Sequence, residues 1–228
     1  MPHPGMDWQS FRVSLQLAGM TLLILLPIAV LIGRALALRD FRGKGFAEAL
    51  VALPLLLPPT VVGFYLLQGF GRNSAAGAWF ESVTGHLLAF SFEGLVVASV
   101  LVNLPFAVQP IQRAWEAIPR NLNEAAANCG MTPLRAFTRV ELPLAWPGVV
   151  TALALTFAHT LGEFGVVLMV GGSIPGETRT LAISIYDRVQ AFDDHSAGIM
   201  AATLLIFSLV ALGLTNSLAR LTARRNAR

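Results

Sequence analysis

The sequence predicts an all-α integral membrane protein with about five transmembrane helices, because its composition and the spacing of its charges both indicate a bilayer. Its 228 residues are 55% hydrophobic and only 13% charged, whereas a soluble domain usually carries about 25% charged residues. The stretches between the charges approach or exceed the roughly 20 apolar residues that cross a bilayer as a helix. Five stretches contain no Asp, Glu, Lys or Arg: 13–33, 49–71, 94–112, 142–162 and 195–219.

These stretches form one membrane domain, which we expect over residues 11–218. A short polar lead at 1–10 precedes the domain, and a basic tail at 219–228 follows it. No internal repeat and no second domain is visible in the sequence. The helical spans are expected at about 13–33, 47–70, 94–112, 147–170 and 197–218.

The second expected span is irregular because it contains the run LPLLLPP. Pro54, Pro58 and Pro59 each remove a backbone donor, so this helix must kink or unwind. Irregular backbone is tolerated within a membrane where it faces a cavity, which makes the three prolines candidates for a gate or pore lining. A simple kink without a functional role is an equally good interpretation.

The loop between the third and fourth spans, residues 116–146, carries helical signals of its own, and we call it the EAA loop. Pro119 suits a first helical turn, where its missing N–H costs nothing, and the EAAA run that follows contains strong helix formers. Gly130 most easily takes the left-handed conformation that closes a helix. Thr132 can cap a second helix, which begins with proline and is expected to stop before Pro143.

The distribution of Lys and Arg predicts how the spans are oriented. If the EAA loop faces the cytoplasm, five spans place the N-terminus outside and the C-terminus inside. Twelve of the sixteen Lys and Arg residues then lie in cytoplasmic segments and four lie outside, as the positive-inside rule expects. The opposite orientation would invert this bias.

The sequence contains none of the common catalytic motifs. Gly43-Lys44-Gly45 lacks the upstream glycine and the Ser or Thr of a phosphate-binding loop, so we expect no ATP hydrolysis by that route. The four histidines are scattered without HExxH or GxSxG, and the single Cys129 excludes a cysteine metal cluster. We therefore expect no catalytic residue and no metal site. The net charge of +3 suits membrane orientation rather than nucleic-acid binding.

A few polar residues within or beside the spans are candidates for function. Glu163 is an acidic residue deep in the fourth span, where an ionisable group is costly and by default functional. His159 lies four residues earlier on the same helical face, so the two can form a structural pair or belong to a translocation path. For Asn103, in the third span, we expect an interhelical hydrogen bond rather than a contact with the solute. Arg179, just outside the fourth span, can attract an oxyanion or anchor a loop.

The EAA loop resembles a cytoplasmic loop in the permease subunits of binding-protein-dependent ABC importers. That loop has the pattern EAA, three residues, Gly, nine residues, then Ile-x-Leu-Pro, and the spacing is the same here. Only Val140 departs from it, and Val for Ile is a mild volume change. The resemblance implies a type I ABC importer permease fold in which the loop forms the coupling helix. The matching residues are Glu124, Ala125, Ala126, Gly130, Leu142 and Pro143.

Two further stretches resemble the molybdate-type (ModB-like) permeases of this family. They are LPLLLPPTVVGFYLL at 53–67 and FAHTLGEFGVVLMVGGSIPGETRT at 157–180. GEFG is shared with sulfate permeases, whereas IPGETRT and the short N-terminus favour molybdate. In such permeases the segment that matches Pro54 to Gly63 would lie near the gate together with Glu163.

The GEFG stretch and the loop after it supply the remaining site candidates. Gly162 and Gly165, on either side of the acidic residue, allow close approach of helices. The outer-loop candidates are Pro175, Gly176, Glu177 and Arg179.

The resemblance also implies partners and a mechanism. Two copies would form the pore as a homodimer in the lipid of the bacterial inner membrane, with the N-terminus periplasmic and the C-terminus cytoplasmic. Two ModC-like ATPase subunits would use ATP and Mg²⁺, so this chain would bind no cofactor, and a periplasmic ModA-like protein would deliver molybdate. Closure of the ATPases would push the EAA loop and switch the pore between inward- and outward-facing states.

Several alternatives remain open from the sequence. A permease of the same kind could carry tungstate or sulfate/thiosulfate. A secondary transporter would usually show paired repeats with broken helices in both halves, and no such pairing is visible. An intramembrane enzyme and a purely structural membrane subunit are more distant possibilities, the latter tolerating substitution throughout Glu124–Pro143.

Overall fold

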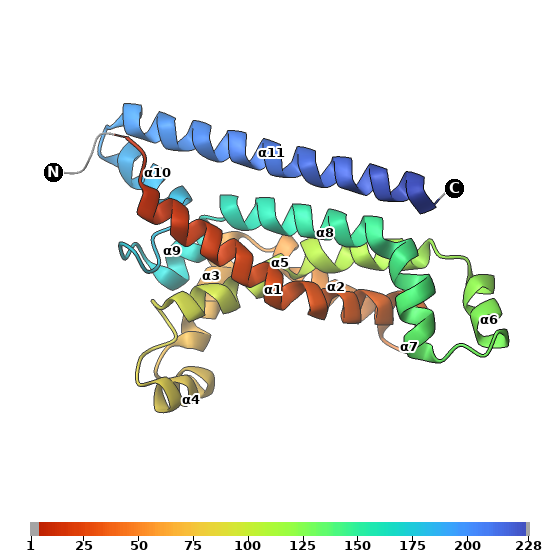
Figure 1. Cartoon of the computed structure of the whole chain (residues 1–228). Coiled ribbons are helices and arrows are strands. Elements are labelled where there is room, and N and C mark those ends of the chain that lie inside the picture. The colour runs from red at the N-terminus through yellow and green to blue at the C-terminus, as the bar shows by residue number, and fades with distance from the viewer. Residues whose placement is uncertain (1–4, 227–228) are drawn as a thin grey trace.

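The computed structural model describes residues 5–226, except for the side chains at positions 120, 123, 214, 216 and 218–226, and every regular element in this part is a helix. The first four residues of the predicted lead, and the side chains of the predicted basic tail, lie outside the described residues. Figure 1 shows the arrangement. The elements are α1 (Trp8–Leu38), α2 (Lys44–Leu56), α3 (Pro59–Phe70), α4 (Ala75–Thr84), α5 (Phe92–Glu116), α6 (Arg120–Asn128), α7 (Pro133–Ala136), a π-helical turn (Phe137–Glu141), α8 (Leu142–Gly162), α9 (Gly165–Gly171), α10 (Leu181–Gln190) and α11 (Asp194–Asn226).

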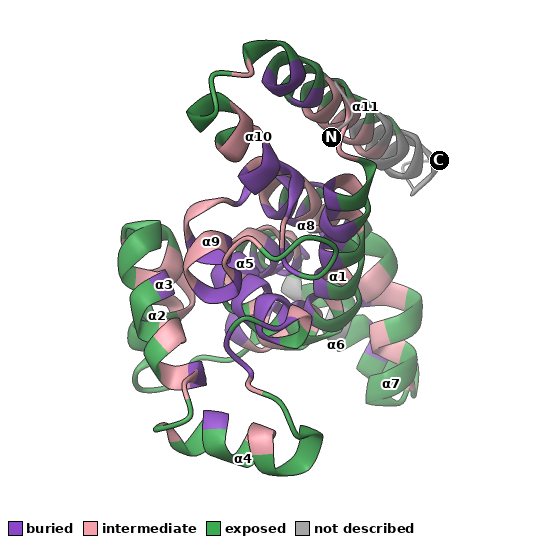
Figure 2. Ribbon diagram, turned by 90° about the vertical axis from the view of Figure 1, so that its left-hand side faces the viewer, coloured by how far each residue is buried: buried purple, intermediate pink, exposed green. Residues whose placement is uncertain are grey.

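Three long helices, α1, α5 and α8, form the centre of the molecule. Their contacting sides carry buried apolar residues of modest size, among them Leu25, Val108 and Ala145. A Cβ at Gly33 of α1 would lie 2.7 Å from Cγ2 of Ile111 in α5, so these two helices approach closely because residue 33 is glycine. Figure 2 shows that buried residues gather on the central helices while α2, α4, α6 and α7 are largely exposed.

The predicted fold class is confirmed. Among the described residues, four helices are long and apolar enough to cross a membrane: α1, α5, the continuous stretch Pro133–Gly162, and Asp194–Gly213 within α11. The pair α2 and α3 makes a fifth if it is counted as one bent span. The EAA loop and the end of α11 lie at one end of the molecule, whereas α4, α9, α10 and the start of α1 lie at the other (Figure 1).

The prediction that prolines interrupt the second span is also confirmed. The α2 and α3 axes differ by 106° across a break at Leu57 and Pro58. Pro58 cannot continue α2, whereas Pro59 opens α3 at a first-turn position where its missing N–H is not needed. The second span is therefore two short helices rather than one kinked helix over 47–70.

The predicted end of the second EAA-loop helix before Pro143 is wrong. The helix continues from Pro133 through a π-helical turn at Phe137–Glu141 into α8. Within this turn the N–H of Leu142 donates to the carbonyl of Phe137, five residues back. The wider turn accommodates Pro143, which would otherwise clash with the preceding helical turn.

The predicted fourth span at 147–170 is likewise wrong. The helix begins earlier and stops at Gly162, after which Glu163 takes an extended conformation with φ −67° and ψ 126°. A separate seven-residue helix, α9, then begins at Gly165. Hydropathy cannot detect this break, because the residues on both sides of it are apolar.

The short helices α3 and α9 pack closely through glycines. A Cβ at Gly63 would lie 2.8 Å from Cβ of Met169, and a Cβ at Gly165 would lie 2.9 Å from Cβ of Pro59. Real Cβ atoms are almost never found so close to other carbon atoms, so both contacts require glycine. The two interrupted spans are thereby held against each other next to their breaks.

We predict that Gly63→Ala destabilises the protein by about 1–3 kcal/mol, the usual cost of overpacking. The matched control is Gly69→Ala in the same helix, where no atom lies within 4 Å of the added Cβ and alanine is the better helix former. Thermal unfolding of the purified protein in detergent measures both. Equal melting temperatures for the two variants would contradict the predicted close contact.

Candidate functional site

The EAA loop forms the two-helix elbow that the sequence predicts. Gly130 has φ +71°, and the N–H groups of Gly130 and Met131 donate to the carbonyls of Ala127 and Ala126 at 2.9 and 3.1 Å. This pair of bonds is the Schellman motif, which favours glycine at its left-handed position. Thr132 then caps α7 by accepting a hydrogen bond from the N–H of Arg135.

The elbow presents most of its predicted residues outward. Glu124, Ala125 and Gly130 are exposed, whereas Ala126 is buried. At the far end of the loop, Leu142 is half-buried and Pro143 is exposed. A surface of small residues and one carboxylate is therefore available to a partner at this end of the molecule.

An ion pair with a buried carboxylate anchors the EAA loop to the central helices. Glu141, only 3% exposed, accepts hydrogen bonds from Nε and Nη2 of Arg34 at 2.5 and 2.9 Å. The indole Nε1 of Trp115 donates to the same carboxylate at 3.1 Å. The guanidinium also lies 5.5 Å from the centre of the Phe137 ring. Three elements, α1, α5 and the π-helical turn, thus meet at one carboxylate.

A chain of polar side chains crosses the centre of the molecule to the break between α8 and α9. Thr21 donates to Oγ of Ser99 at 2.9 Å, and the amide nitrogen of Asn103 donates to the carbonyl of Ser99 at 2.8 Å. The amide oxygen of Asn103 lies 3.1 Å from Nδ1 of His159. Nε2 of that ring lies 3.6 Å from Oε2 of Glu163. The interhelical interpretation of Asn103 is therefore the one that the structure supports.

Glu163 also has a structural role that the sequence did not suggest. Its Oε1 accepts a hydrogen bond from the N–H of Val166 at 3.2 Å, which satisfies a donor in the first turn of α9. Helix starts leave such N–H groups without intrahelical partners, and inside a bilayer no water is available to them. The carboxylate therefore stabilises the interruption of the fourth span.

A small hollow of about 120 Å³ brings several predicted gate residues together. Pro54, Pro59, His159 and Glu163 line it, but Pro58, Asn103 and the three candidate glycines do not. Gly63 and Gly165 instead form the close contact between α3 and α9, and no atom lies near Gly162 to require glycine there.

The sequence reasoning missed Phe106, which also lines this hollow. Its ring stacks on the imidazole of His159 with centroids 4.0 Å apart. Phe106 follows Asn103 by three residues, and residues three apart on a helix lie on the same face, so the sequence contained a signal for its position.

Arg179 anchors the outer loop. Its Nε donates to Oγ of Ser173 at 3.0 Å and lies 3.7 Å from Oδ2 of Asp187. The loop-anchor interpretation is thus supported over the oxyanion one, since the guanidinium is already paired.

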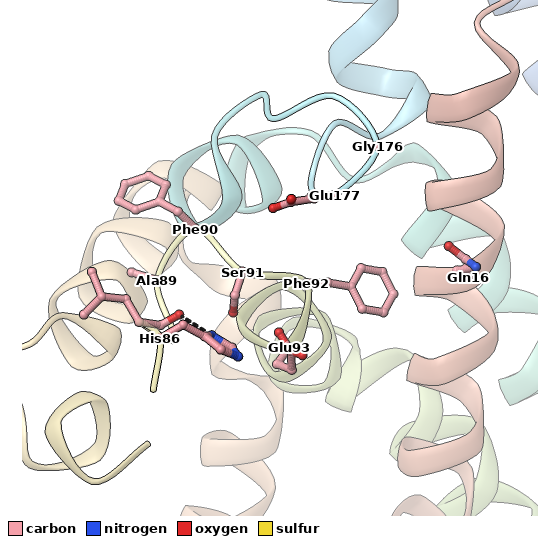
Figure 3. Close-up of a pocket in the computed structure, with 10 residues that line it drawn as sticks. Gln16, His86, Ala89, Phe90, Ser91, Phe92, Glu93, Gly176 and Glu177 are labelled. Atoms are coloured by element: carbon pink, nitrogen blue, oxygen red, sulfur yellow. Dashed lines mark hydrogen bonds between the residues drawn. The ribbon is translucent and has the colours of Figure 1, made fainter. Parts of the chain in front are cut away.

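The other outer-loop candidates are exposed, and two of them border a hollow of about 550 Å³ (Figure 3). Gly176 and Glu177 contribute to its wall, together with Glu93 and His86, whereas Pro175 does not. None of the described residues that line this hollow is Lys or Arg. Two carboxylates without a cation make it unsuited to an anion.

Asp7 fixes the start of α1 at the same end of the molecule. Its carboxylate accepts from the N–H of Ser10 at 3.0 Å and from the hydroxyl of Ser184 at 2.9 Å. Burial favours the neutral acid, but these hydrogen bonds and the charge of Arg179 outweigh it, so the pKa of Asp7 lies below its ordinary value.

The helical fold, the interrupted spans and the exposed elbow together define a membrane-embedded permease of the type found in ABC importers. Solved structures support the fold. A bacterial alginate ABC transporter in complex with an alginate pentasaccharide-bound periplasmic protein matches with a TM-score of 0.77 and 17% identity over 94% of this chain and 79% of that one. The MetNI methionine ABC transporter matches with a TM-score of 0.70 and 18% identity over 94% and 93%.

Sequence comparison defines the family. Residues 26–228 match the binding-protein-dependent transport system inner membrane component, and the chain belongs to this family. The molybdenum transport system permease protein ModB of Azotobacter vinelandii is 46% identical over 93% of this chain and 94% of its own. Its counterpart from Escherichia coli K12 is 34% identical over 97% of both. A probable sulfate transport system permease protein of Chlorella vulgaris is 28% identical over 91% and 78%.

We predict that Arg34→Gln destabilises the protein by about 2–3 kcal/mol, because it leaves the buried Glu141 carboxylate without its counter-charge. Glu141→Gln should cost less, because the Arg34 side chain that it leaves unpaired is partly exposed to solvent. The double variant is expected to lose less than the sum of the two, since both changes remove the same interaction. Thermal unfolding provides the measurement. The control is Arg139→Gln, because Arg139 is an exposed arginine of the same turn. If the stability losses of the two single variants simply add up in the double variant, the predicted interaction between Arg34 and Glu141 is contradicted.

We predict that Glu163→Gln retains transport within about threefold, because the amide oxygen still accepts from the Val166 N–H. Glu163→Ala removes that acceptor and should cost about 1 kcal/mol or more in stability, as loss of a helix cap does. Uptake and thermal unfolding of both variants measure the difference. If Glu163→Gln is as defective in uptake as Glu163→Ala, while equally stable as the parent, the carboxylate charge itself acts in gating.

Proposed function

We propose that this chain is the transmembrane permease subunit of an ATP-driven importer that moves molybdate across the bacterial inner membrane. The observation that carries the proposal is the 46% identity to a molybdenum transport permease over 93% of the chain. Tungstate and sulfate or thiosulfate are alternative solutes, and the more distant sulfate relative supports considering the latter.

The energy source lies in a partner in this proposal. The sequence has no phosphate-binding loop, so two ModC-like ATPase subunits would bind ATP and Mg²⁺ and this chain would bind no cofactor. The EAA loop supports this arrangement because its elbow is exposed while its far end is tied to α1 and α5 through Glu141. A displacement of the elbow by the ATPase subunits would therefore also move α1 and α5. This movement would drive the change between inward- and outward-facing states.

The proposed functional unit is a homodimer that receives solute from a periplasmic ModA-like binding protein. Helix α2 supports dimer formation, because none of its residues is buried in the single chain. The excess of Lys and Arg on the side of the EAA loop supports an N-terminus in the periplasm and a C-terminus in the cytoplasm. The opposite placement of the outer loop and the EAA loop in Figure 1 is consistent with this orientation.

Uptake by reconstituted complexes tests the proposal. Proteoliposomes that contain the permease with its ATPase subunits are supplied with the binding protein, ATP inside and labelled molybdate outside. We expect uptake that requires all components, with excess tungstate and sulfate showing which anions compete. Uptake that persists without the ATPase subunits would instead indicate a secondary transporter.

We predict that Gly130→Val uncouples the complex, lowering uptake more than about tenfold at unchanged membrane insertion. A β-branched residue is strained in the left-handed conformation at φ +71°, so the angle between α6 and α7 should change. Gly130→Asn is the matched control, because asparagine tolerates this conformation. Uptake and ATP hydrolysis are measured together, and normal uptake by Gly130→Val would remove the coupling role of the elbow.

A further inference from the structure

The side of α5 that faces away from α1 carries a polar pair that none of the interactions above involves. Gln109 and Arg113 are both exposed and lie one helical turn apart, on the same face as Phe106. α5 is one of the helices long and apolar enough to cross the membrane. Polar and charged side chains on a spanning helix are costly against lipid and usually face a water-filled cavity. Gln109 lies within the expected span and Arg113 in the last turn of the helix, so this face of α5 leads from the membrane interior to its expected cytoplasmic end.

The pair lines a hollow of about 360 Å³ between α2, α5 and α8. Leu55 of α2 and Leu155 of α8 close its sides, and the rest of its wall comes from α5. Among the described residues that line it, Arg113 is the only charged one and Gln109 the only other one with a polar side chain. A cation, an amide and apolar walls form a suitable environment for a small anion.

This hollow adjoins two others along α5. It shares Leu55 and Phe106 with the hollow at His159 and Glu163, and it shares Gln109 and Arg113 with a third hollow of about 550 Å³ nearer the EAA loop. The three together run from the interrupted fourth span toward the cytoplasmic end expected from the charge distribution. Neighbouring hollows thus share lining residues on one face of α5.

The guanidinium of Arg113 is available for a ligand. Arg34, Arg72, Arg179 and Arg188 each pair with a carboxylate, whereas Arg113 forms no side-chain ion pair or hydrogen bond within the described part of the chain. A guanidinium presents parallel N–H donors that match two oxygens of a tetrahedral oxyanion.

Carboxylates border the cationic hollow on both sides. Glu163 lines the hollow beside the interrupted fourth span, and Glu48 and Glu116 line the hollow nearer the EAA loop. The side-chain amide of Gln112 donates to Glu48 and Glu116 at 2.7 and 2.9 Å. The carboxylates on the two sides limit how tightly an anion is held between them. Binding that is strong enough to admit a solute and weak enough to release it is what a transport path needs.

We propose that Arg113 and Gln109 form a site that binds an oxyanion transiently in the inner half of the translocation path, and we call this site the station. The proposal rests on the proposed function, since it assigns a solute contact within the same importer. Arg113 supplies the charge and Gln109 a second donor, while Phe106 separates this station from the Glu163 carboxylate.

Charge variants in the reconstituted complex test the station. The variants are Arg113→Gln, Arg113→Lys and Arg113→Glu, with Arg42→Gln as the control, because Arg42 is also exposed and lies in the loop before α2. Labelled molybdate uptake and ATP hydrolysis stimulated by the loaded binding protein are measured on equal amounts of assembled complex. We expect uptake to fall about tenfold in Arg113→Gln and further in Arg113→Glu, as loss of a charge-assisted contact implies.

The readouts separate a solute contact from the other roles of an arginine. Stimulated ATP hydrolysis should persist in Arg113→Gln, so that fewer anions cross per ATP, and Arg113→Lys should recover most of the uptake. Uptake by Arg113→Gln equal to that of Arg42→Gln overturns the station and leaves Arg113 as a membrane anchor. A parallel loss of uptake and ATP hydrolysis also overturns it, because Arg113 would then act in coupling. If the unmodified complex moves no molybdate at all, it is the proposed function that fails.

Discussion

Two of the membrane helices in this chain are interrupted, and the structure around them is shaped by the need to satisfy the backbone groups that each interruption frees. Water is absent from the hydrocarbon region, so an unpaired N–H or carbonyl there costs several kcal/mol. At the first interruption prolines remove donors altogether, with Pro59 opening α3. At the second, the Glu163 carboxylate accepts from the start of α9. The close glycine contacts between α3 and α9 then hold the two broken spans together.

Helix α5 connects this interrupted region to the EAA loop. Near its middle, Asn103 bonds to His159 beside the break in the fourth span, and near its end Trp115 bonds to the Glu141 carboxylate. The same helix packs along α1, which contributes Arg34 to that carboxylate. A displacement of the EAA loop therefore cannot remain local, because its anchor is shared with the helix that borders the hollows of the proposed path.

Local chemistry was enough to predict some of these features. The elbow follows from Gly130, Thr132 and the proline after it, whose preferences are set by backbone geometry and need no distant partner. The break at Pro58 follows from the missing donor in the same way. The count of spans followed from hydropathy, which measures how well each segment dissolves in lipid.

The features that sequence reasoning missed depend on contacts between distant residues or on breaks that composition hides. Arg34 and Glu141 are 107 residues apart, and nothing in either neighbourhood indicates the other. Glu163 was recognised as unusual, but its bond to a backbone N–H becomes visible only once the helix is known to stop. Arg113 stands at the end of a span, where an arginine indicates orientation, and only the helix shows that it lies one turn from Gln109.

The π-helical turn at Phe137–Glu141 has a geometric consequence for the whole loop. A π turn contains one more residue than an α-helical turn, and each residue of an α-helix advances by about 100° around its axis. Removing one residue from this turn would rotate everything on its N-terminal side, including α6 and α7, by about that angle relative to α8. The direction in which the EAA loop projects therefore depends on the number of residues in this one turn.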